Sequence, residues 1–514
     1  MERSRCRVRV ALGLCLTVAG LLIWVSSAAA TSLYLRPDAD NASPLWSVTG
    51  ATSRWDALND PVTESETPSS SDYITRVSGI APQLNVELGT TSRAGLKVLS
   101  ASAWFYTPDA TPIAMTVVDG TNGFEPSLAS KTSSSPGWQN VTFALPSSQT
   151  KLDGLRLKFA SSGFSSGTRR IYVAFVRLNV EVPSTSIYWG SWIDGDVYTK
   201  SPEPTWPDAP YGDTLLNPNP TWNLFESHAG KPVSIVHFGQ PAPWNQDFAA
   251  GPFESTRRRG AIPLVDMDAD GMTLASIAAG DHDAEFKKWF SDAASNFGYP
   301  MFFRWSWEMN GTWFKPYGPE SAASPSLYVA VWQHLHDLAV AKGANNITWV
   351  WCPNVIFSGS TSLKALYPGD AYVDWTCMDG YNRGDNPIKP EGFKSFSEVF
   401  SQTYNELLAI APSKPIMIGE TGSTELMGLI PHPKKFEWIS EGLGVELASN
   451  FPKVEAILWF NWNAPDEDTG ERWDWQIESS AAAESAFRNV ISSSYYAANS
   501  FGSLPSQTKV QALP

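Results

Sequence analysis

The sequence predicts two folded parts of different class, an all-β sandwich followed by a (β/α)8 TIM barrel. In the first part, short segments are β-branched or alternate between apolar and polar residues, and none keeps a helical period. In the second part, an apolar strand, a loop and a helical segment follow one another repeatedly. Eight such strands within roughly 310 residues have the size and rhythm of a (β/α)8 barrel.

Residues 1–30 are predicted to be a secretory signal peptide. Four arginines precede an apolar stretch from Val10 to Val25, and Ala28-Ala29-Ala30 forms a cleavage site of the A-x-A type. The alternative is a retained N-terminal anchor, which the shortness of the apolar stretch disfavours. We therefore expect a secreted, extracellular protein that has no membrane contact after cleavage.

The composition narrows the range of partners. The 514 residues have a formal charge of −15, and loss of the signal peptide removes four arginines and one glutamate, which changes the charge to −18. An acidic chain is poorly suited to bind nucleic acid or an anionic membrane. A neutral polymer needs no electrostatic steering. The 23 tryptophans offer flat rings for stacking on sugars, although many of them must belong to the core.

Residues 31–183 are predicted to form the sandwich, of the jelly-roll type. Clusters of Pro, Gly, Ser and Asp separate its strands. Such a domain either binds carbohydrate or serves as a packing or spacer domain, and the sequence leaves both roles open. Strands are expected at Tyr73-Val77, Ala101-Tyr106, Ile113-Val118, Val141-Leu145, Leu155-Phe159 and Ile171-Val180.

Residues 184–493 are predicted to form the barrel. Phe286, Phe290 and Phe297 follow a helical period, and Ser324-Pro325 has the form of an N-cap followed by proline at the first helical position. The eight strands are expected at Ile187-Trp192, Val233-Phe238, Ala261-Val265, Met301-Trp307, Ile347-Cys352, Val373-Met378, Pro415-Ile418 and Ala456-Phe460.

Two further expectations concern the C-terminus and the cysteines. Residues 494–514 are rich in Ser, Ala and Pro, and we expect a flexible tail. After signal cleavage only Cys352 and Cys377 remain, so no framework of disulfides holds the chain together. The two cysteines lie on consecutive predicted strands. We favour two buried thiols over a single disulfide formed after export.

Two glutamates stand where predicted strands end. Glu308 follows the fourth strand and Glu420 follows the seventh. The C-terminal edge of the strands is where (β/α)8 enzymes carry their catalytic groups. The fourth and seventh strands of a closed barrel stand roughly opposite each other, so both side chains are expected to reach the same centre. By alternation, Arg304 shares the inward face with Glu308. Two facing carboxylic acids are the minimum for cleaving a glycosidic bond.

The motifs around these glutamates carry a resemblance to a known family. The segment from Phe303 to Phe314 resembles the acid/base motif of glycoside hydrolase family 26, the β-mannanase family. Ile418-Gly419-Glu420 is similar to the end of that family's seventh strand. The resemblance spans about 187–492 and does not cover the sandwich. Its first strand and its fifth and sixth strand ends are similar to Ile187-Tyr188-Trp189-Gly190, Trp351-Cys352-Pro353-Asn354 and Met378-Asp379-Gly380-Tyr381-Asn382.

The resemblance implies a retaining, two-step hydrolysis of a β-linked polysaccharide. Glu308 would be the general acid/base, and Glu420 would be the nucleophile that forms the glycosyl-enzyme ester. Arg304 is expected to keep Glu420 ionised, and Tyr381 is expected to donate a hydrogen bond to the same carboxylate.

Other side chains are expected to touch the substrate. Trp313 and Trp462 are expected as sugar platforms, and His237 is expected to line the cleft. Asp266 is either a substrate contact or part of an acidic turn. The full set of expected substrate contacts is Arg304, Trp307, Asn310, Trp313, Tyr381, Trp462, His237 and Asp266.

No metal site or cofactor is expected. The six histidines form no H-E-x-x-H motif. The acidic run that begins at Asp266 has Ile277 at the twelfth position, where a calcium loop needs a carboxylate. No phosphate-binding loop follows any predicted strand.

Trp307 occupies the position where mannanases of the family usually carry histidine. An indole offers one donor and an apolar face but no acceptor, so a weaker distinction between mannan and glucan is expected. The leading interpretation is a secreted, monomeric endo-β-glycosidase with β-1,4-mannan as its first candidate substrate. The alternatives are a β-glucanase or xylanase on the same scaffold, or a non-catalytic carbohydrate-binding wall protein, which the presence of both glutamates disfavours.

Overall fold

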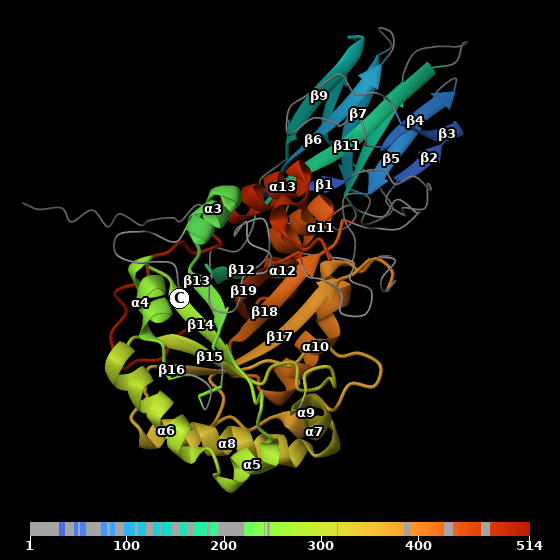
Figure 1. Cartoon of the computed structure of the whole chain (residues 1–514). Helices are drawn as coiled ribbons and strands as arrows, with labels where there is room; N and C mark the ends of the chain where they lie inside the picture. The colour runs from blue at the N-terminus through green and yellow to red at the C-terminus, as the bar shows by residue number, and fades with distance from the viewer. Residues whose placement is uncertain are drawn as a thin grey trace, which may run out of the picture.

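The computed structural model contains a closed eight-stranded parallel barrel and two antiparallel sheets (Figure 1). Residues 1–29, most of the predicted signal peptide, lie outside its described residues. Within the described part, no helix has the length and apolar character needed to cross a membrane. The structure describes residues 30–35, 46–49, 52–57, 73–79, 83–87, 97–107, 112–119, 127–133, 135–145, 155–161, 169–181, 186–193, 220–240, 242–243, 247–315, 317–384, 391–425, 435–463 and 473–514.

The predicted (β/α)8 barrel is confirmed, and all eight expected strands are present. They pair in chain order, and the last strand closes against the first. Strands β13 to β16 are buried along their whole length, which explains why they appear in the sequence as continuous apolar runs. The strands are β12 (Tyr188–Ile193), β13 (Ile235–Gly239), β14 (Ile262–Met267), β15 (Met301–Trp305), β16 (Ile347–Trp351), β17 (Trp375–Asn382), β18 (Ile416–Ser423) and β19 (Val454–Asn461).

Helices surround the barrel (Figure 1). The predicted helix start at Ser324-Pro325 is confirmed, because Ser324 is the N-cap of α8. The apolar period from Phe286 ends at Gly298, which has a left-handed φ of 72° that favours glycine. The helical elements are α3 (Pro220–Ala229), α4 (Ala250–Arg258), α5 (Leu274–Ala279), α6 (Asp283–Asp292), η2 (Ala293–Phe297), α7 (Tyr317–Ala323), α8 (Pro325–Ala341), α9 (Leu363–Leu366), α10 (Phe396–Ile410), α11 (Lys435–Glu441), η3 (Gly442–Glu446), α12 (Leu447–Asn450), η4 (Ile477–Ser479) and α13 (Ala481–Ile491).

The N-terminal part has two antiparallel sheets, with the orders β3-β4-β11-β6-β9, where β1 also pairs with β11, and β2-β5-β10-β7-β8. The ring of Phe105 on β6 meets that of Phe159 on β10, 6.2 Å between centroids, so the sheets face each other. The six strands expected from the sequence are present, whereas a jelly-roll type of connection stays a prediction. The strands are β1 (Ala30–Leu35), β2 (Trp46–Thr49), β3 (Thr52–Ala57), β4 (Tyr73–Gly79), β5 (Gln83–Glu87), β6 (Lys97–Thr107), β7 (Ile113–Asp119), β8 (Ser127–Ser133), β9 (Gly137–Ala144), β10 (Leu155–Ser161) and β11 (Arg169–Glu181).

Residues 494–514 were expected to be a flexible tail, and the structure corrects this expectation. The segment packs under the N-terminal ends of the barrel strands. The ring of Phe501 lies 5.0 Å from that of Tyr188. The backbone of Val510 donates to Thr348 Oγ1 at 2.8 Å and accepts a hydrogen bond from Trp375 Nε1 at 3.2 Å. A few apolar side chains and these backbone bonds hold the segment, although its overall composition is typical of a loose tail.

The preference for two free thiols was also wrong. Cys352 and Cys377 form a disulfide, with 4.2 Å between their Cα atoms. Trp351 on β16 is in register with Thr376 on β17, so the next residue of each strand faces its counterpart. The disulfide therefore joins two neighbouring strands directly beneath their C-terminal ends.

Candidate active site

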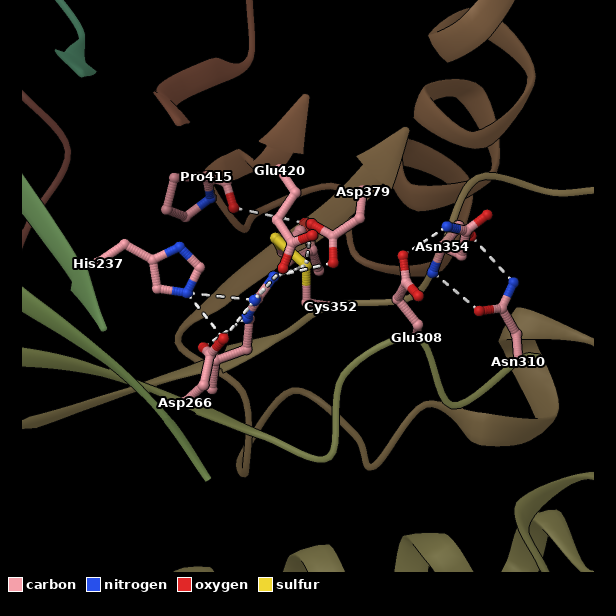
Figure 2. Close-up of a disulfide and its surroundings, with 12 residues drawn as sticks. His237, Asp266, Glu308, Asn310, Cys352, Asn354, Asp379, Pro415 and Glu420 are labelled. Carbon is pink, nitrogen blue, oxygen red and sulfur yellow. Dashed lines mark hydrogen bonds and ion pairs between the residues drawn. A yellow bond between two sulfur atoms is a disulfide. The ribbon is translucent and has the colours of Figure 1, made fainter. Parts of the chain in front are cut away.

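Glu308 and Glu420 meet at the C-terminal edge of the barrel strands (Figure 2). One carboxylate oxygen of each, together with one of Asp379, lie within 4.8 Å of one another. Glu308 is 7% exposed and Glu420 is 8% exposed. The fold thus brings the two acids, 112 positions apart in the sequence, into one nearly buried pair.

The backbone at Glu308 is held in an unusual conformation. Ser306 and Glu308 have φ values of 41° and 52°, in the left-handed region that residues other than glycine rarely adopt. Ser306 N donates to Met267 O at 2.9 Å, and Glu308 N donates to Cys352 O at 2.7 Å. Bonds to the strands on both sides therefore stabilise the turn, as is common where strain serves to aim a functional side chain.

Among the described residues, the groups that donate hydrogen bonds to the carboxylate of Glu308 are neutral. Trp313 Nε1 donates to Oε2 at 2.5 Å, and Asn354 Nδ2 donates to Oε1 at 2.6 Å. Burial, followed by the charge of Glu420, raises the pKa of Glu308 to about 7, although the bonds from Asn354 and Trp313 oppose this shift. A carboxyl group with this pKa can donate and accept a proton near neutral pH.

The carboxylate of Glu420 has a cation beside it. Arg304 Nη2 donates to Oε1 and the hydroxyl of Tyr381 donates to Oε2, each at 2.5 Å. Burial and the negative charge of Glu420 raise the pKa of Tyr381 far above its usual value, so the phenol keeps its proton. Both expected partners of Glu420 are therefore in place, and each donates a hydrogen bond to a different oxygen of its carboxylate.

Arg304 is fully buried and links several acids. Its Nε donates to Asp266 Oδ1 at 2.7 Å, and its Nη1 donates to Asp379 Oδ2 at 2.8 Å. His237 Nε2 lies 2.7 Å from Asp266 Oδ2. Burial alone would raise the pKa of Asp266, but Arg304 and His237 together hold it below its usual value. Burial raises the pKa of Asp379 well above its usual value.

Three of the expected substrate contacts have another position in the structure. Asp266 and His237 are buried and hold Arg304 rather than lining an open cleft. The side-chain amide of Asn310 donates to Asn354 O at 2.9 Å and accepts a bond from Asn354 N at 2.8 Å. These three side chains position Arg304 and Asn354, because Nε2 of His237, the carboxylate of Asp266 and the amide of Asn310 bind neighbouring protein groups.

The predicted tryptophans differ in exposure. Trp313 is 47% exposed, and its ring lies 5.3 Å from that of Phe357, so one aromatic surface is open beside Glu308. Trp307 packs at 5.0 Å from Phe314 and covers the Arg304 guanidinium at 5.1 Å. It is therefore a wall of the site rather than an open platform.

A second group of rings lies on the side of Glu420. Trp462 is partly buried, with its ring 5.9 Å from that of Phe460. The ring of Tyr381 stacks on that of Trp475 at 4.5 Å and 26°. Trp475 stacks in turn on Trp473 at 5.3 Å and 10°.

Several contributing residues were missed at the sequence level. Asn354 and Asp379 stand inside strand-end motifs, and that position was the available signal for them. Gly419 leaves room for its neighbours, because an added Cβ would lie 2.6 Å from Cys377 Sγ and 2.7 Å from Asp379 Oδ1. Trp475 had no local signal, since its role depends on a stack with Tyr381 from another strand.

Among the described residues, besides the disulfide-bonded Cys352 and Cys377 with Asp379, two groups of side chains have the spacing of metal ligands, namely Glu308 with Asp379 and Glu420, and His237 with Asp266 and Glu420. Arg304 contacts Asp266, Asp379 and Glu420. Its guanidinium already supplies the positive charge that a cation would bring, so we assign the balancing charge to Arg304.

The chain was compared with known sequences. Residues 280–420 match the family model described as Glycosyl hydrolase family 26. Endoglucanase H of Acetivibrio thermocellus is 32% identical over 274 residues, which are 52% of this chain and 28% of that protein. Mannan endo-1,4-beta-mannosidase of Bifidobacterium adolescentis is 26% identical over 196 residues, 37% of this chain and 19% of that protein. The chain spans less than a third of the length of either relative.

Solved structures were compared as well. A GH26-CBM35 β-(1,4)-mannanase of Podospora anserina aligns with a TM-score of 0.38 at 14% identity, over 91% of this chain and 98% of that chain. The catalytic domain of a GH26 endo-β-1,4-mannanase of Bacillus sp. JAMB-750 aligns with a TM-score of 0.44 at 18% identity, over 62% and 88%.

Proposed function

We propose that this protein is a secreted, retaining endo-β-glycosidase that hydrolyses β-1,4-mannan, because residues 280–420 of its barrel match the model of glycosyl hydrolase family 26. The observation that carries the proposal is that the two carboxyl groups of one pair have different surroundings, which suit them to different catalytic roles. Glu308, with a pKa of about 7, is suited to be the acid/base. Glu420, paired with Arg304, is suited to be the nucleophile.

In the first step, Glu308 protonates the leaving oxygen while Glu420 attacks the anomeric carbon and forms a covalent ester. In the second step, Glu308 takes a proton from water as the water oxygen attacks the anomeric carbon, which breaks the ester bond to Glu420 and releases the sugar. Carboxylate oxygens within 4.8 Å of each other support retention, because an inverting pair stands about 6.5–9.5 Å apart to admit a water molecule. Arg304 and Tyr381 donate hydrogen bonds to the carboxylate of the proposed nucleophile and orient it.

β-Glucan is the second candidate substrate, and two observations favour it. The relative with 32% identity is named an endoglucanase. Trp307 packs over Arg304 at the position where the family's mannanases usually carry histidine. Mannose and glucose differ in the orientation of the 2-hydroxyl, so a side chain at this position bears on the choice between them.

The test is a reducing-sugar assay on β-mannan, mixed-linkage β-glucan, xylan and laminarin, with Glu420→Ala as the matched inactive control. Release of reducing sugar from mannan by the native enzyme, but not by Glu420→Ala, would support the proposal. Release of reducing sugar from β-glucan alone would support the second candidate. Proton NMR of the first products reads the stereochemistry, and retention predicts the β-anomer. If no polymer is cut but one is still bound, the protein is a non-catalytic carbohydrate-binding protein.

Export has its own test. We propose cleavage after Ala30, which rests on the arginines, the apolar stretch and the alanines of residues 1–30. N-terminal sequencing of protein from the culture medium should begin at Thr31. A protein that stays with the cells and keeps its first thirty residues would contradict the proposal.

A further inference from the structure

A buried cation lies outside the catalytic network. Lys435, the first residue of α11, is fully buried. Its ammonium donates to Asp474 O at 2.5 Å, Gln476 O at 2.7 Å and Ser479 Oγ at 2.9 Å. Burial lowers its pKa to about 8, although Asp474, Glu425 and Glu478 oppose this shift, so the group is still charged near neutral pH. A buried charge is tolerated when its hydrogen bonds are satisfied, as they are here.

The two carbonyls bound by Lys435 flank Trp475. The carbonyl of Trp475 itself accepts a hydrogen bond from Trp459 Nε1 at 2.8 Å. Three consecutive carbonyls of residues 474–476 are therefore fixed by side chains of α11 and β19. The backbone that carries Trp475 has no regular hydrogen-bonded element of its own at this point, so these bonds determine where the indole lies.

Trp475 is connected to Glu420 through one intervening residue, Tyr381. Its ring stacks on Tyr381 at 4.5 Å, and the hydroxyl of Tyr381 donates to Glu420 Oε2 at 2.5 Å. Phe460 meets Tyr381 edge-on at 5.8 Å. The position of the phenol therefore depends in part on the ring of Trp475, whose neighbouring carbonyls bind Lys435, although the lysine itself does not contact Glu420.

The charges around Lys435 serve the same segment. The carboxylate of Asp474 accepts bonds from Thr424 Oγ1 at 2.5 Å and from Glu425 N at 3.1 Å. Glu425 Oε1 accepts bonds from Ser479 and Ser480 at 2.8 and 2.7 Å. These bonds join the end of β18, which carries Glu420, to the segment that carries Trp475.

We propose that Lys435 is a positioning residue of the active site, which acts through Trp475 and Tyr381 to hold Glu420 in its attacking geometry. This inference rests on the proposed function, because it assigns Glu420 as the nucleophile. It implies that the loss of the ammonium slows the formation of the glycosyl-enzyme rather than merely loosening the fold.

The chain offers a matched control at the other end of the barrel. Lys231 donates to three backbone carbonyls, those of Ile491 at 3.1 Å, Ser493 at 2.8 Å and Tyr496 at 2.5 Å. Burial lowers its pKa too. Lys231 precedes β13, on the N-terminal side of the barrel and away from the glutamates. Lys231→Met therefore removes the same kind of clamp without disturbing the proposed path.

The experiment is a double-mutant cycle on the rate of the glycosylation burst with an aryl glycoside. Lys435→Met should slow the burst on the order of tenfold, the value of one hydrogen bond. In a Tyr381→Phe background it should slow the burst by less than about twofold, because the path is already broken. Lys231→Met should leave the burst rate unchanged in both backgrounds. Equal slowing by Lys435→Met in both backgrounds, or no slowing, overturns the inference.

Two additions keep the test decisive. Trp475→Leu breaks the next link and should show the same coupling to Tyr381→Phe, so it replaces Lys435→Met if that variant does not fold. Additive effects of Trp475→Leu would overturn the inference equally. If the native enzyme cuts no substrate, the proposed function fails, and the same cycle is read on the thermal unfolding midpoint. In that measurement, the effect of Lys435→Met on the unfolding midpoint should depend on Tyr381→Phe, whereas the effect of Lys231→Met should not. If the effects of Lys435→Met and Tyr381→Phe are additive, the inference that Lys435 acts on Tyr381 is overturned.

Discussion

The two sides of the active site contain the same acid in different surroundings. Glu308 receives bonds from an indole and an amide, both neutral, whereas Glu420 receives bonds from a guanidinium and a phenol. Both carboxyl groups are nearly buried, so burial alone does not distinguish them. The position of Arg304 does, because its Nη2 is directed at Glu420.

This difference shows how the single positive charge of Arg304 can give two residues of the same type different properties. Burial and the charge of Glu420 raise the pKa of Glu308, so the ionised nucleophile itself helps to keep its partner protonated. Like charges in a shared site oppose the ionisation of both members, and Arg304 forms an ion pair with Glu420. The proposed assignment of acid/base and nucleophile rests on this asymmetry, and each prediction below tests one side against the other.

The largest expected effect comes from deleting each acid. Glu420→Ala should lower kcat by about 10⁴-fold to 10⁶-fold on every substrate, because no covalent ester can form. Glu308→Ala should spare glycosylation by aryl glycosides with good leaving groups, because those need little protonation. Burst kinetics on activated and unactivated substrates measure both. Equal loss of the glycosylation rate on both substrates in Glu308→Ala would break the assigned division.

A smaller effect is expected from the neutral donor on the nucleophile side. Tyr381→Phe removes a hydrogen bond to a carboxylate, worth about 1.5–3 kcal/mol, so kcat/KM should fall about 10-fold to 150-fold. The optimum pH should change little on the alkaline side, because Glu308 does not bind this phenol. Steady-state kinetics across pH on one substrate check this prediction. An unchanged kcat/KM would mean that Arg304 alone orients Glu420.

The barrel and its two acids were predictable because their signals are local. A strand buried on both faces appears as an apolar run, and Glu308 and Glu420 each end one such run inside a distinctive motif. The same signals located Arg304 and Tyr381 by alternation and by motif. Each of these inferences needed only neighbours in the sequence and the rule that barrel strands follow one another.

Other features were not predictable because they depend on pairing between distant segments. Asp266 and His237 were expected at the cleft, but Arg304 draws them into the buried network. Lys435 had no motif, and its three acceptors lie about forty positions later. The segment after Ser494 is rich in Ser, Ala and Pro, yet it packs against the N-terminal ends of the barrel strands. Contacts between distant segments determine which polar groups are buried, and these contacts cannot be predicted from composition.

The donors to Glu308 give the next prediction, a shift of the pH profile. Asn354 and Trp313 bond the carboxylate and lower the pKa of Glu308, so their removal should raise it. The acid form would then persist to higher pH, and the alkaline limb of kcat/KM should move up by about 0.5–1 unit in Trp313→Phe or Asn354→Ala. Tyr381→Phe is the control, and its alkaline limb should not move. A downward shift in Asn354→Ala would contradict the sign.

The smallest expected effect concerns Trp307, which lies between the two sides. Its indole packs on Phe314 and covers Arg304, so it offers the substrate an apolar edge and no acceptor. A histidine at this position would add an acceptor near the 2-hydroxyl, where mannose and glucose differ. One such bond is worth about 0.5–1.5 kcal/mol, so Trp307→His should change the mannan-to-glucan ratio of kcat/KM by about tenfold at most. Matched manno- and gluco-oligosaccharides measure that ratio. A strict preference for mannan in the native enzyme, unchanged by the substitution, would show that Trp307 serves only to cover Arg304.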